Sequence, residues 1–335
     1  ALARLQDILE VRHIMDVDAA VASSVAARVG ATAGTSMEAL LGDPGVDIVA
    51  VCSPHQFHAD QVIAACRAGK KAVLCEKPFA TSAEQAARIS AVSRETGVPI
   101  VVGAMHTFDP GWLAAEKNWG GLPERVHTIR SSIVLPPNAR FEDFATEIVT
   151  RPTAGQPDYA DIEVIKSALQ GGIMGLAIHD LPLVRRFAPD FEQIEVLQAR
   201  HVRPFGYAVS LRTPTRVIEL RAVMNGTWKP EWTFEAIADD SALRIDFTPS
   251  YVQAGSAVAT FSRHGSETST FGPYGHNGYE GEWRELAELA RGTRPAPSAQ
   301  SLIDDLTFAL AIADATVASA AAGHASAAEK AGVSA

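Results

Sequence analysis

Residues 46–80 decide the fold, and their sequence is VDIVAVCSPHQFHADQVIAACRAGKKAVLCEKPFA. Two short apolar runs, residues 47–52 and 71–75, flank a segment in which apolar residues recur at helical spacing. Gly69 stands where such a helix would end. A crossover of this length makes the two strands that it joins parallel. The stretch therefore predicts a strand–helix–strand unit within a parallel sheet.

Both predicted strands end in residues suited to chemistry. Residues 53–55 (Ser-Pro-His) follow the first strand, and residues 76–78 (Glu-Lys-Pro) follow the second. Ligands of open parallel sheets bind just beyond the carboxyl ends of the strands. We therefore expect both tripeptides to border one crevice.

The composition is that of an ordinary globular protein, with 335 residues, 47% of them hydrophobic, and a formal net charge of −10. This length is sufficient for two domains. The negative charge argues against nucleic acid or an anionic membrane as a partner. We expect no apolar run to be long enough to span a bilayer, and residues 1–12 carry charges where a signal peptide is apolar.

Three cysteines, Cys52, Cys66 and Cys75, stand at apolar positions. They lack the spacing of metal ligands, and the histidines and carboxylates do not cluster, so we expect no metal site. Reduced cysteines in a protein core are typical of the cytoplasm, which is the compartment we expect.

Residues 11–15 predict a strand that ends at Asp16. An acidic residue at the end of the second Rossmann strand binds the adenosine ribose hydroxyls of NAD. The alternative is a helix cap, because a helix is expected to begin near Asp18, and either aspartate can serve as that cap. The sequence leaves both roles open for Asp16.

The glycine-rich phosphate loop of a dinucleotide-binding fold precedes such an acid by about 20 residues. Counted back from Asp16, this position lies before residue 1. The glycines that follow the acid do not open a helix directly after a strand. Two explanations stay open: a truncated amino terminus, which we favour, or a protein that has lost its pyrophosphate cradle.

Strands and helices alternate up to about residue 122, which predicts a doubly wound parallel sheet. Beyond it, seven runs separated by turn residues predict a large, open, mainly antiparallel sheet: 126–135, 194–202, 207–212, 216–223, 232–238, 243–247 and 257–262. We therefore expect an α/β fold with a nucleotide-binding domain over residues 1–122 and an α+β domain over residues 123–335. Residues 140–170 are expected to form an insertion or lid, and residues 171–187 a helical region.

Three motifs stand in a particular order: residues 53–58 (Ser-Pro-His-Gln-Phe-His), residues 75–78 (Cys-Glu-Lys-Pro), and Gly171-Gly172 leading to His179. Together they resemble the Gfo/Idh/MocA oxidoreductases, which include inositol dehydrogenases and glucose–fructose oxidoreductase. The resemblance implies an amino-terminal Rossmann domain for NAD(P). It also implies a carboxyl-terminal sheet domain that holds a small-molecule substrate and builds homodimers or homotetramers.

By this resemblance Lys77 is the catalytic lysine and His179 the general base. Oxidation of a secondary alcohol needs a cation near the developing alkoxide and a group that takes the hydroxyl proton, and these two side chains suit those tasks. Asp16 favours NAD over NADP, because a carboxylate repels a 2′-phosphate. The implied cofactor-binding residues are Asp16, Ser53, Pro54, His55, His58, Glu76, Lys77 and Met105.

The sequence departs from the family pattern beside the proposed base. The family commonly carries an aspartate four residues before this histidine, one helical turn away, but Gly175 occupies that position here. Asp180 follows His179 directly and projects about 100° away from it round a helix. Because Pro182 follows two residues later, we favour a helix-capping role for Asp180 over a catalytic one.

Further histidines are weaker candidates for contact with substrate. Residues 105–107 (Met-His-Thr) stand where many members have Asn-Arg-Arg, which makes His106 a candidate. His276 lies in a glycine-rich loop before a predicted helix and is equally compatible with an ordinary surface turn. The candidate substrate-binding residues are thus Lys77, His106, His179, Asp180 and His276.

The sequence predicts an NAD-dependent oxidoreductase that transfers a hydride between nicotinamide and a secondary alcohol of a sugar, polyol or cyclitol. Two alternatives stay open. A cofactor-deficient homologue that binds a sugar fits the missing glycine loop and Gly175. An NAD-assisted glycoside-cleaving enzyme fits the same motifs.

Overall fold

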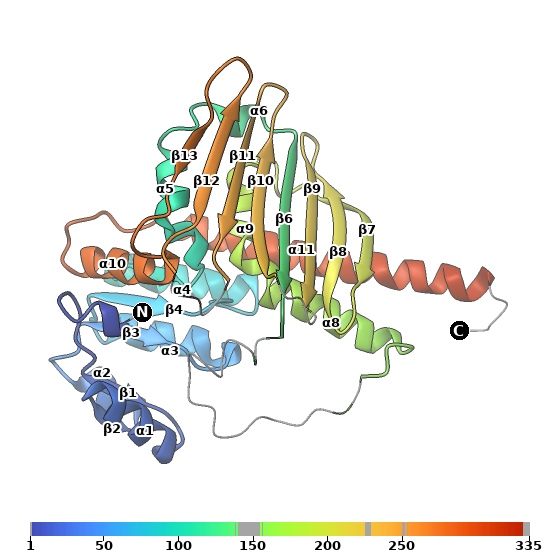
Figure 1. Ribbon diagram of the computed structural model, residues 1–335. Coiled ribbons are helices and arrows are strands. Elements are labelled where there is room, and N and C mark those ends of the chain that lie inside the picture. The colour runs from blue at the N-terminus through green and yellow to red at the C-terminus, as the bar shows by residue number, and fades with distance from the viewer. Residues whose placement is uncertain are drawn as a thin grey trace. The chain divides into compact units, whose positions relative to one another are not determined.

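The computed structural model describes residues 2–137, 139, 155, 157–224, 229–249, 252 and 254–330. Contacts within the chain define two compact units, whose elements are labelled in Figure 1. Unit 1 comprises Ala1–Phe108 and Gly278–Thr307, and unit 2 comprises Asp109–Asn277 and Phe308–Ala335. This division differs from the boundary expected at residue 122, because the chain returns to unit 1 after the large sheet.

Unit 1 contains short parallel strands in two sheets. β1 (His13–Met15) pairs with β2 (Thr32–Gly34). In the second sheet β4 (Ala72–Cys75) lies between β3 (Ile48–Val51) and β5 (Ile100–Val102). The predicted parallel pairing of the two strands in residues 46–80 is confirmed. β2 was not predicted, because its residues are largely exposed and carry no apolar run.

Local signals set the ends of the helices in unit 1. α1 (Ala19–Val29) begins where the Asp18 carboxylate accepts hydrogen bonds from the first-turn amides, and it ends at Gly30 with φ 71°. α4 (Ala83–Thr96) is bounded in the same way by a serine cap and a left-handed glycine. The remaining helical elements are η1 (Leu2–Arg4), α2 (Met37–Gly42), η2 (His55–Phe57), α3 (His58–Arg67), η3 (Met105–Phe108) and α10 (Gly278–Ala290).

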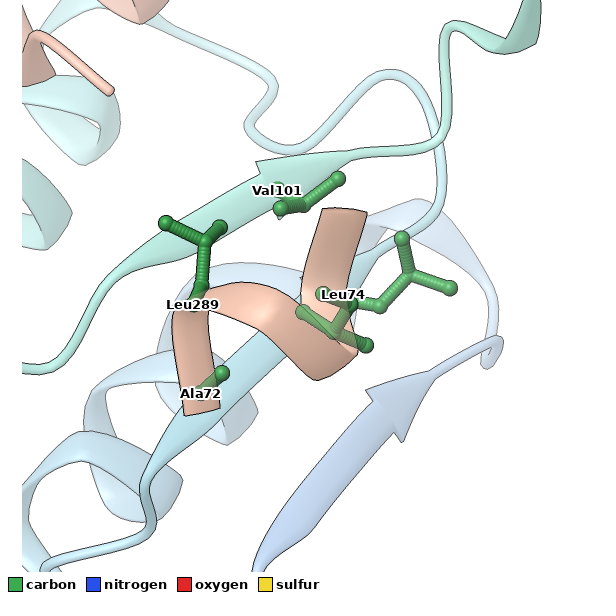
Figure 2. Packing of buried hydrophobic residues seen from close by; sticks show 5 residues of the cluster. Ala72, Leu74, Val101 and Leu289 are labelled. Atoms are coloured by element: carbon green, nitrogen blue, oxygen red, sulfur yellow. The ribbon is translucent and has the colours of Figure 1, made fainter. Parts of the chain in front are cut away.

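Helix α10 explains why residues 278–307 belong to unit 1. Its Leu286 and Leu289 pack against Ala72 and Leu74 of β4 and Val101 of β5, and Figure 2 shows α10 lying across these strands. Val73 points to the opposite face of the sheet and is also fully buried, so helices cover β4 on both sides. A doubly wound sheet has this arrangement.

Unit 2 is built on an eight-stranded sheet with the order β13-β12-β11-β10-β6-β9-β8-β7, seen as a row of arrows in Figure 1. All its pairs are antiparallel except β6 with β9. Its strands are β6 (Thr128–Leu135), β7 (Glu195–His201), β8 (Phe205–Arg212), β9 (Val217–Met224), β10 (Glu231–Ile237), β11 (Ser241–Phe247), β12 (Val258–Arg263) and β13 (Ser269–Phe271). The predicted open, mainly antiparallel sheet is confirmed.

One face of this sheet packs on an aromatic core. The ring of Trp112, on α5 (Pro110–Glu116), contacts Trp119, Phe187 and Phe234 in edge-to-face arrangements. The other helices of unit 2 are α6 (Leu122–Arg125), α8 (Ile162–Gly175), η4 (Ala177–His179), α9 (Leu181–Arg186) and most of α11 (Ala299–Lys330).

The expected lid over residues 140–170 is in part a helix. Residues 140–154 and 156 lie outside the described residues. From Ile162 onward the segment forms α8, which the Asp161 carboxylate caps by accepting from the Glu163 amide. The helical region expected over residues 171–187 is the end of α8, the turn η4 and α9.

Helix α11 corrects the expectation that every apolar run falls short of a bilayer. Its portion Ala299–His324 is long and apolar enough to cross a membrane, judged by length and composition alone. A core helix passes the same test, and Phe308 and Ile312 of this helix are fully buried.

Candidate functional site

In unit 1 the loops after β3 and β4 are joined by one side chain. His58, the first residue of α3, is only 1% exposed. Its Nδ1 lies 2.9 Å from the carbonyl oxygen of Pro78, and its Nε2 lies 2.7 Å from that of Ser53. The imidazole thus links the Ser-Pro-His turn to the Glu-Lys-Pro turn. Both ring nitrogens are used inside the protein, so His58 supports the expected cofactor loops instead of being placed to contact a cofactor.

The rest of the Ser-Pro-His turn is accessible. Ser53 Oγ donates to Gln61 Oε1 at 2.5 Å, which anchors the turn to α3. Pro54 and His55 are exposed at the carboxyl end of β3. Both residues are therefore accessible to a ligand, and their contact with a cofactor stays a prediction.

Lys77 is the second residue after β4 and is half-buried. Burial lowers the pKa of its ammonium group, and the neighbouring Glu76 carboxylate acts in the opposite direction. The Lys77 amide also donates to Glu76 Oε2 at 3.3 Å. This lysine is therefore a desolvated cation with a carboxylate beside it, unlike an ordinary surface lysine.

The loop after β5 holds Glu76 in place from the other side. A Cβ at Gly103 would lie 3.2 Å from the Glu76 carboxyl carbon, a tight contact that this side chain could relieve only by shifting a few tenths of an ångström. Met105 and His106 follow in η3, and both are buried. Because β3, β4 and β5 are parallel, the loops that follow them lie at one edge of the sheet.

The two roles left open for Asp16 are now separated. Asp18 caps α1, because its Oδ1 accepts from the amides of Ala20 and Val21. Asp16 stands at the end of β1, half-exposed, and its Oδ1 accepts only a local bond from the Asp18 amide among the bonds found for it. It remains the candidate for the ribose hydroxyls.

A carboxyl group that the sequence did not single out lies near Glu76. Glu282 of α10 is 3% exposed, and its Oε2 has no hydrogen-bond partner among the described residues. Burial raises its pKa well above the ordinary value, and the Glu76 charge adds to this effect. The signal was available: Glu282 lies one helical turn before Leu286, within the apolar stripe of α10.

In unit 2, His179 ends the short turn η4 and is buried. The chain does not continue as an α-helix here, because the amides of His179 and Asp180 bond to carbonyls three residues earlier. The expected α-helical turn between Gly175 and His179 is therefore wrong, since α8 ends at Gly175. A Cβ at Gly175 would meet nothing within 4 Å.

The capping role favoured for Asp180 is also wrong. It precedes α9, but its side chain makes no capping hydrogen bond. Instead its Oδ2 accepts from Ser131 Oγ at 2.6 Å and from Trp232 Nε1 at 2.8 Å. Asp180 is 0% exposed, so its carboxylate is an internal anchor of unit 2.

The structure therefore groups the candidates by unit. Unit 1 brings Ser53, His58, Glu76 and Lys77 together, while His179 and Asp180 belong to unit 2. His276 lies in the loop before α10 and is half-exposed. That Lys77 and His179 act on one substrate stays a prediction.

Comparison with known proteins agrees with the motifs. Residues 1–104 match the Gfo/Idh/MocA model, described as an oxidoreductase family with an NAD-binding Rossmann fold. Inositol 2-dehydrogenase 3 of Saccharopolyspora erythraea is 36% identical over 140 residues, which are 40% of this chain and 41% of that protein. The match thus spans less than half the length of this relative.

Two solved structures share the fold over most of its length. UDP-N-acetylglucosamine 3-dehydrogenase GnnA from Acidithiobacillus ferrooxidans gives a TM-score of 0.71 at 18% identity, covering 95% of this chain and 93% of that chain. KijD10, a 3-ketoreductase from Actinomadura kijaniata in complex with NADP, gives 0.64 at 21% identity, covering 90% and 88%. Residues 1–104 thus match the Gfo/Idh/MocA oxidoreductases and their NAD-binding Rossmann fold, and the solved structures share the fold of the whole chain.

Proposed function

We propose that this protein is an NAD(P)-dependent oxidoreductase that transfers a hydride between nicotinamide and a secondary alcohol of a sugar, polyol or cyclitol. The observation that carries the proposal is Lys77, a desolvated ammonium group beside Glu76 at the carboxyl end of a central parallel strand. The names of the relatives, an inositol dehydrogenase and a 3-ketoreductase, support the same class of substrate.

Lys77 stabilises the negative charge that develops on the substrate oxygen. A cation acts most strongly in a site from which water is excluded, because the local dielectric is low there. Burial gives Lys77 that environment, and the neighbouring Glu76 carboxylate favours the charged form of its amine. The nicotinamide, when bound, accepts or supplies the hydride.

His179 is proposed to take the hydroxyl proton in oxidation and to return it in reduction. An imidazole changes charge near neutral pH, which suits a group that must both accept and donate. Its place in unit 2, on the turn between α8 and α9, gives it a rigid support of buried neighbours.

For the cofactor we propose NAD, with Asp16 accepting hydrogen bonds from the ribose hydroxyls. Its half-exposed carboxylate at the end of β1 opposes a 2′-phosphate. The turn after β3, with exposed Pro54 and His55, lies at the same edge of the sheet as the loop after β5, where a cofactor of this fold binds. NADP, which KijD10 holds, is the competing outcome.

The test compares two lysines that bracket β4. Lys77→Ala should lower kcat by about 1000-fold, because a preorganised charge at the reacting oxygen is lost. Lys71→Ala is the matched control, since Lys71 is exposed and pairs with Asp47 at 3.0 Å. Assays would follow NADH formation with myo-inositol and other polyols. A Lys77→Ala enzyme with most of its activity would contradict the proposal.

Calorimetric titration with NAD separates this proposal from a cofactor-deficient sugar-binding protein. Binding of NAD that Asp16→Ala weakens supports the enzyme. Absence of heat with both NAD and NADP, together with heat on addition of a polyol, would favour the binding protein instead.

We also propose a homo-oligomer in the cytoplasm, assembled through the outward face of the large sheet. That face carries ion pairs between neighbouring strands, including Arg130 with Glu219 and Arg244 with Glu235. Cys52, Cys66 and Cys75 are all free thiols, which suits a reducing compartment. Light scattering of the purified protein measures the assembly state directly.

A further inference from the structure

Unit 2 contains a buried polar cluster next to His179. Asp180 receives two hydrogen bonds on the same oxygen, one from the Ser131 hydroxyl and one from the Trp232 indole. All three side chains are nearly inaccessible to solvent. A buried carboxylate is costly unless donors surround it, so these contacts hold Asp180 firmly in one position.

The register of the sheet places both donors. Trp232 of β10 pairs with Ile133 of β6, and Phe234 pairs with Ser131. Ser131 and Trp232 are therefore diagonal neighbours on the covered face of two adjacent strands. Both side chains donate to Asp180, which follows His179 in the segment between α8 and α9.

Trp232 also contacts the imidazole itself. The rings of His179 and Trp232 lie with centroids 5.5 Å apart and planes at 82°, an edge-to-face arrangement. Asp180 thus fixes the indole through its N–H, and the same indole packs against His179. Tyr207 of β8 adds to this environment, because burial and the Asp180 charge both raise its pKa well above the ordinary value.

We propose that Asp180 is a positioning residue for His179, acting through the indole of Trp232. The Asp180–Trp232 bond fixes the plane of the indole, and the indole fixes the plane of the imidazole. The inference rests on the proposed role of His179 in proton exchange, but the coupling between the two rings is independent of that role. This role accounts for the buried carboxylate of Asp180, which does not cap α9.

Four variants distinguish the loss of the Asp180–Trp232 hydrogen bond from the general cost of removing buried groups. Trp232→Phe keeps an aromatic ring but removes the indole N–H, and Asp180→Asn keeps the size but removes the charge. Ser131→Ala removes the other donor to the same oxygen and leaves the indole bond in place. Trp112→Phe is the control for shortening a buried tryptophan elsewhere in unit 2.

The primary measurement is the NMR titration of the His179 imidazole in the full chain. We expect Trp232→Phe and Asp180→Asn to move its pKa by about half a unit or more, which is within the spread seen among protein histidines. Ser131→Ala and Trp112→Phe should leave the titration unchanged. A purely structural role would lower the melting temperature of all four variants without moving the titration of His179.

Kinetics give the second measurement. Trp232→Phe should lower kcat about 10- to 100-fold with little change in KM, because a misplaced base slows proton transfer more than it weakens binding. An unchanged His179 titration in both Trp232→Phe and Asp180→Asn would overturn the inference. A shifted titration in an enzyme that His179→Asn leaves fully active would instead contradict the proposed role of His179.

Discussion

His58 is an internal brace between the two loops that carry the family motifs. Each of its ring nitrogens lies within hydrogen-bond distance of a backbone carbonyl oxygen, Nε2 of Ser53 and Nδ1 of Pro78. Removing the ring takes a hydrogen-bonding partner from these carbonyl oxygens, which costs about 1–3 kcal/mol, and leaves a cavity at a position that is only 1% exposed. We therefore expect His58→Ala to lower the free energy of unfolding by about 2–4 kcal/mol.

Urea denaturation measures this effect, and His55 supplies the control. His55 lies three residues earlier in the same loop and is exposed, so His55→Ala should change stability by at most about 0.5 kcal/mol. Equal urea midpoints for His58→Ala and His55→Ala would show that the His58 imidazole contributes nothing to the stability of the protein.

Glu282 makes the stability of the protein depend on pH. Its pKa in the folded state is raised above its ordinary value of 4.5, mainly by burial. The folded state therefore holds the proton more tightly than the unfolded state, and this contribution is complete below pH 4.5. It is lost as the pH rises from there through the folded-state pKa.

Glu282→Gln removes this dependence, because the amide is neutral at every pH. As the pH rises from 5 to 8, we expect the melting temperature of the wild type to fall relative to that of Glu282→Gln. Glu285→Gln, on the same helix, is the control, because Glu285 is paired with Arg294. Parallel melting curves for the wild type and Glu282→Gln across this range would contradict the prediction.

Among the elements, α8 contains a glycine with room for a side chain, and β8 contains one without such room. Gly175 ends α8, and a Cβ there meets nothing within 4 Å, so Gly175→Ala should stabilise the protein by about 0.5–1 kcal/mol. Gly206 lies in β8, where a Cβ would come within 2.4 Å of the Ala222 carbonyl oxygen on β9. Gly206→Ala should therefore destabilise it by about 1–3 kcal/mol. Thermal denaturation of the two variants tests both predictions. A lower melting temperature for Gly175→Ala would contradict the conclusion that there is room for a Cβ at this position.

The elements that sequence predicted well are those defined by local signals. Apolar runs located β3 and β4, and a helix of fixed length between them required parallel pairing. Gly69, expected to end the helix between them, follows α3 in the left-handed conformation. These signals depend on nearby residues only, so no knowledge of the tertiary structure is needed to interpret them.

The sequence failed where distant segments decide the local structure. Helical periodicity continues through His179, but the chain turns there because Asp180 bonds to strands about 50 residues away. Likewise, the leucines of α10 predict a helix with an apolar face without saying which unit that face covers. Spacing also identified Lys77 and His179 as candidates, and the apolar stripe of α10 carries a signal for the burial of Glu282, whereas the brace at His58 required coordinates.

At the scale of the whole molecule, unit 1 depends on a stretch that returns from far along the chain. Without α10, the apolar surface of Ala72, Leu74 and Val101 has lost its cover. Exposure of Leu-sized side chains costs about 1.5–3 kcal/mol each, which is a large share of the stability of a small domain. A contiguous fragment of residues 1–122 should therefore fail to fold cooperatively.

A rearranged fragment tests whether the missing cover is the cause. The Phe108 carbonyl oxygen lies within 2.2 Å of the position that a Cβ on Gly281 would take, so the end of η3 and the start of α10 are adjacent. Residues 1–108 joined to residues 278–307 by about six glycine and serine residues span this short distance without strain. We expect this fusion to melt in one cooperative transition by circular dichroism, whereas residues 1–122 do not.

Leu289→Ala in the fusion should lower its stability by about 2–5 kcal/mol, since Leu289 packs directly on the β4–β5 surface. If residues 1–122 fold as well as the fusion does, the nucleotide-binding unit ends at the boundary drawn from sequence, and α10 is only an accessory to it.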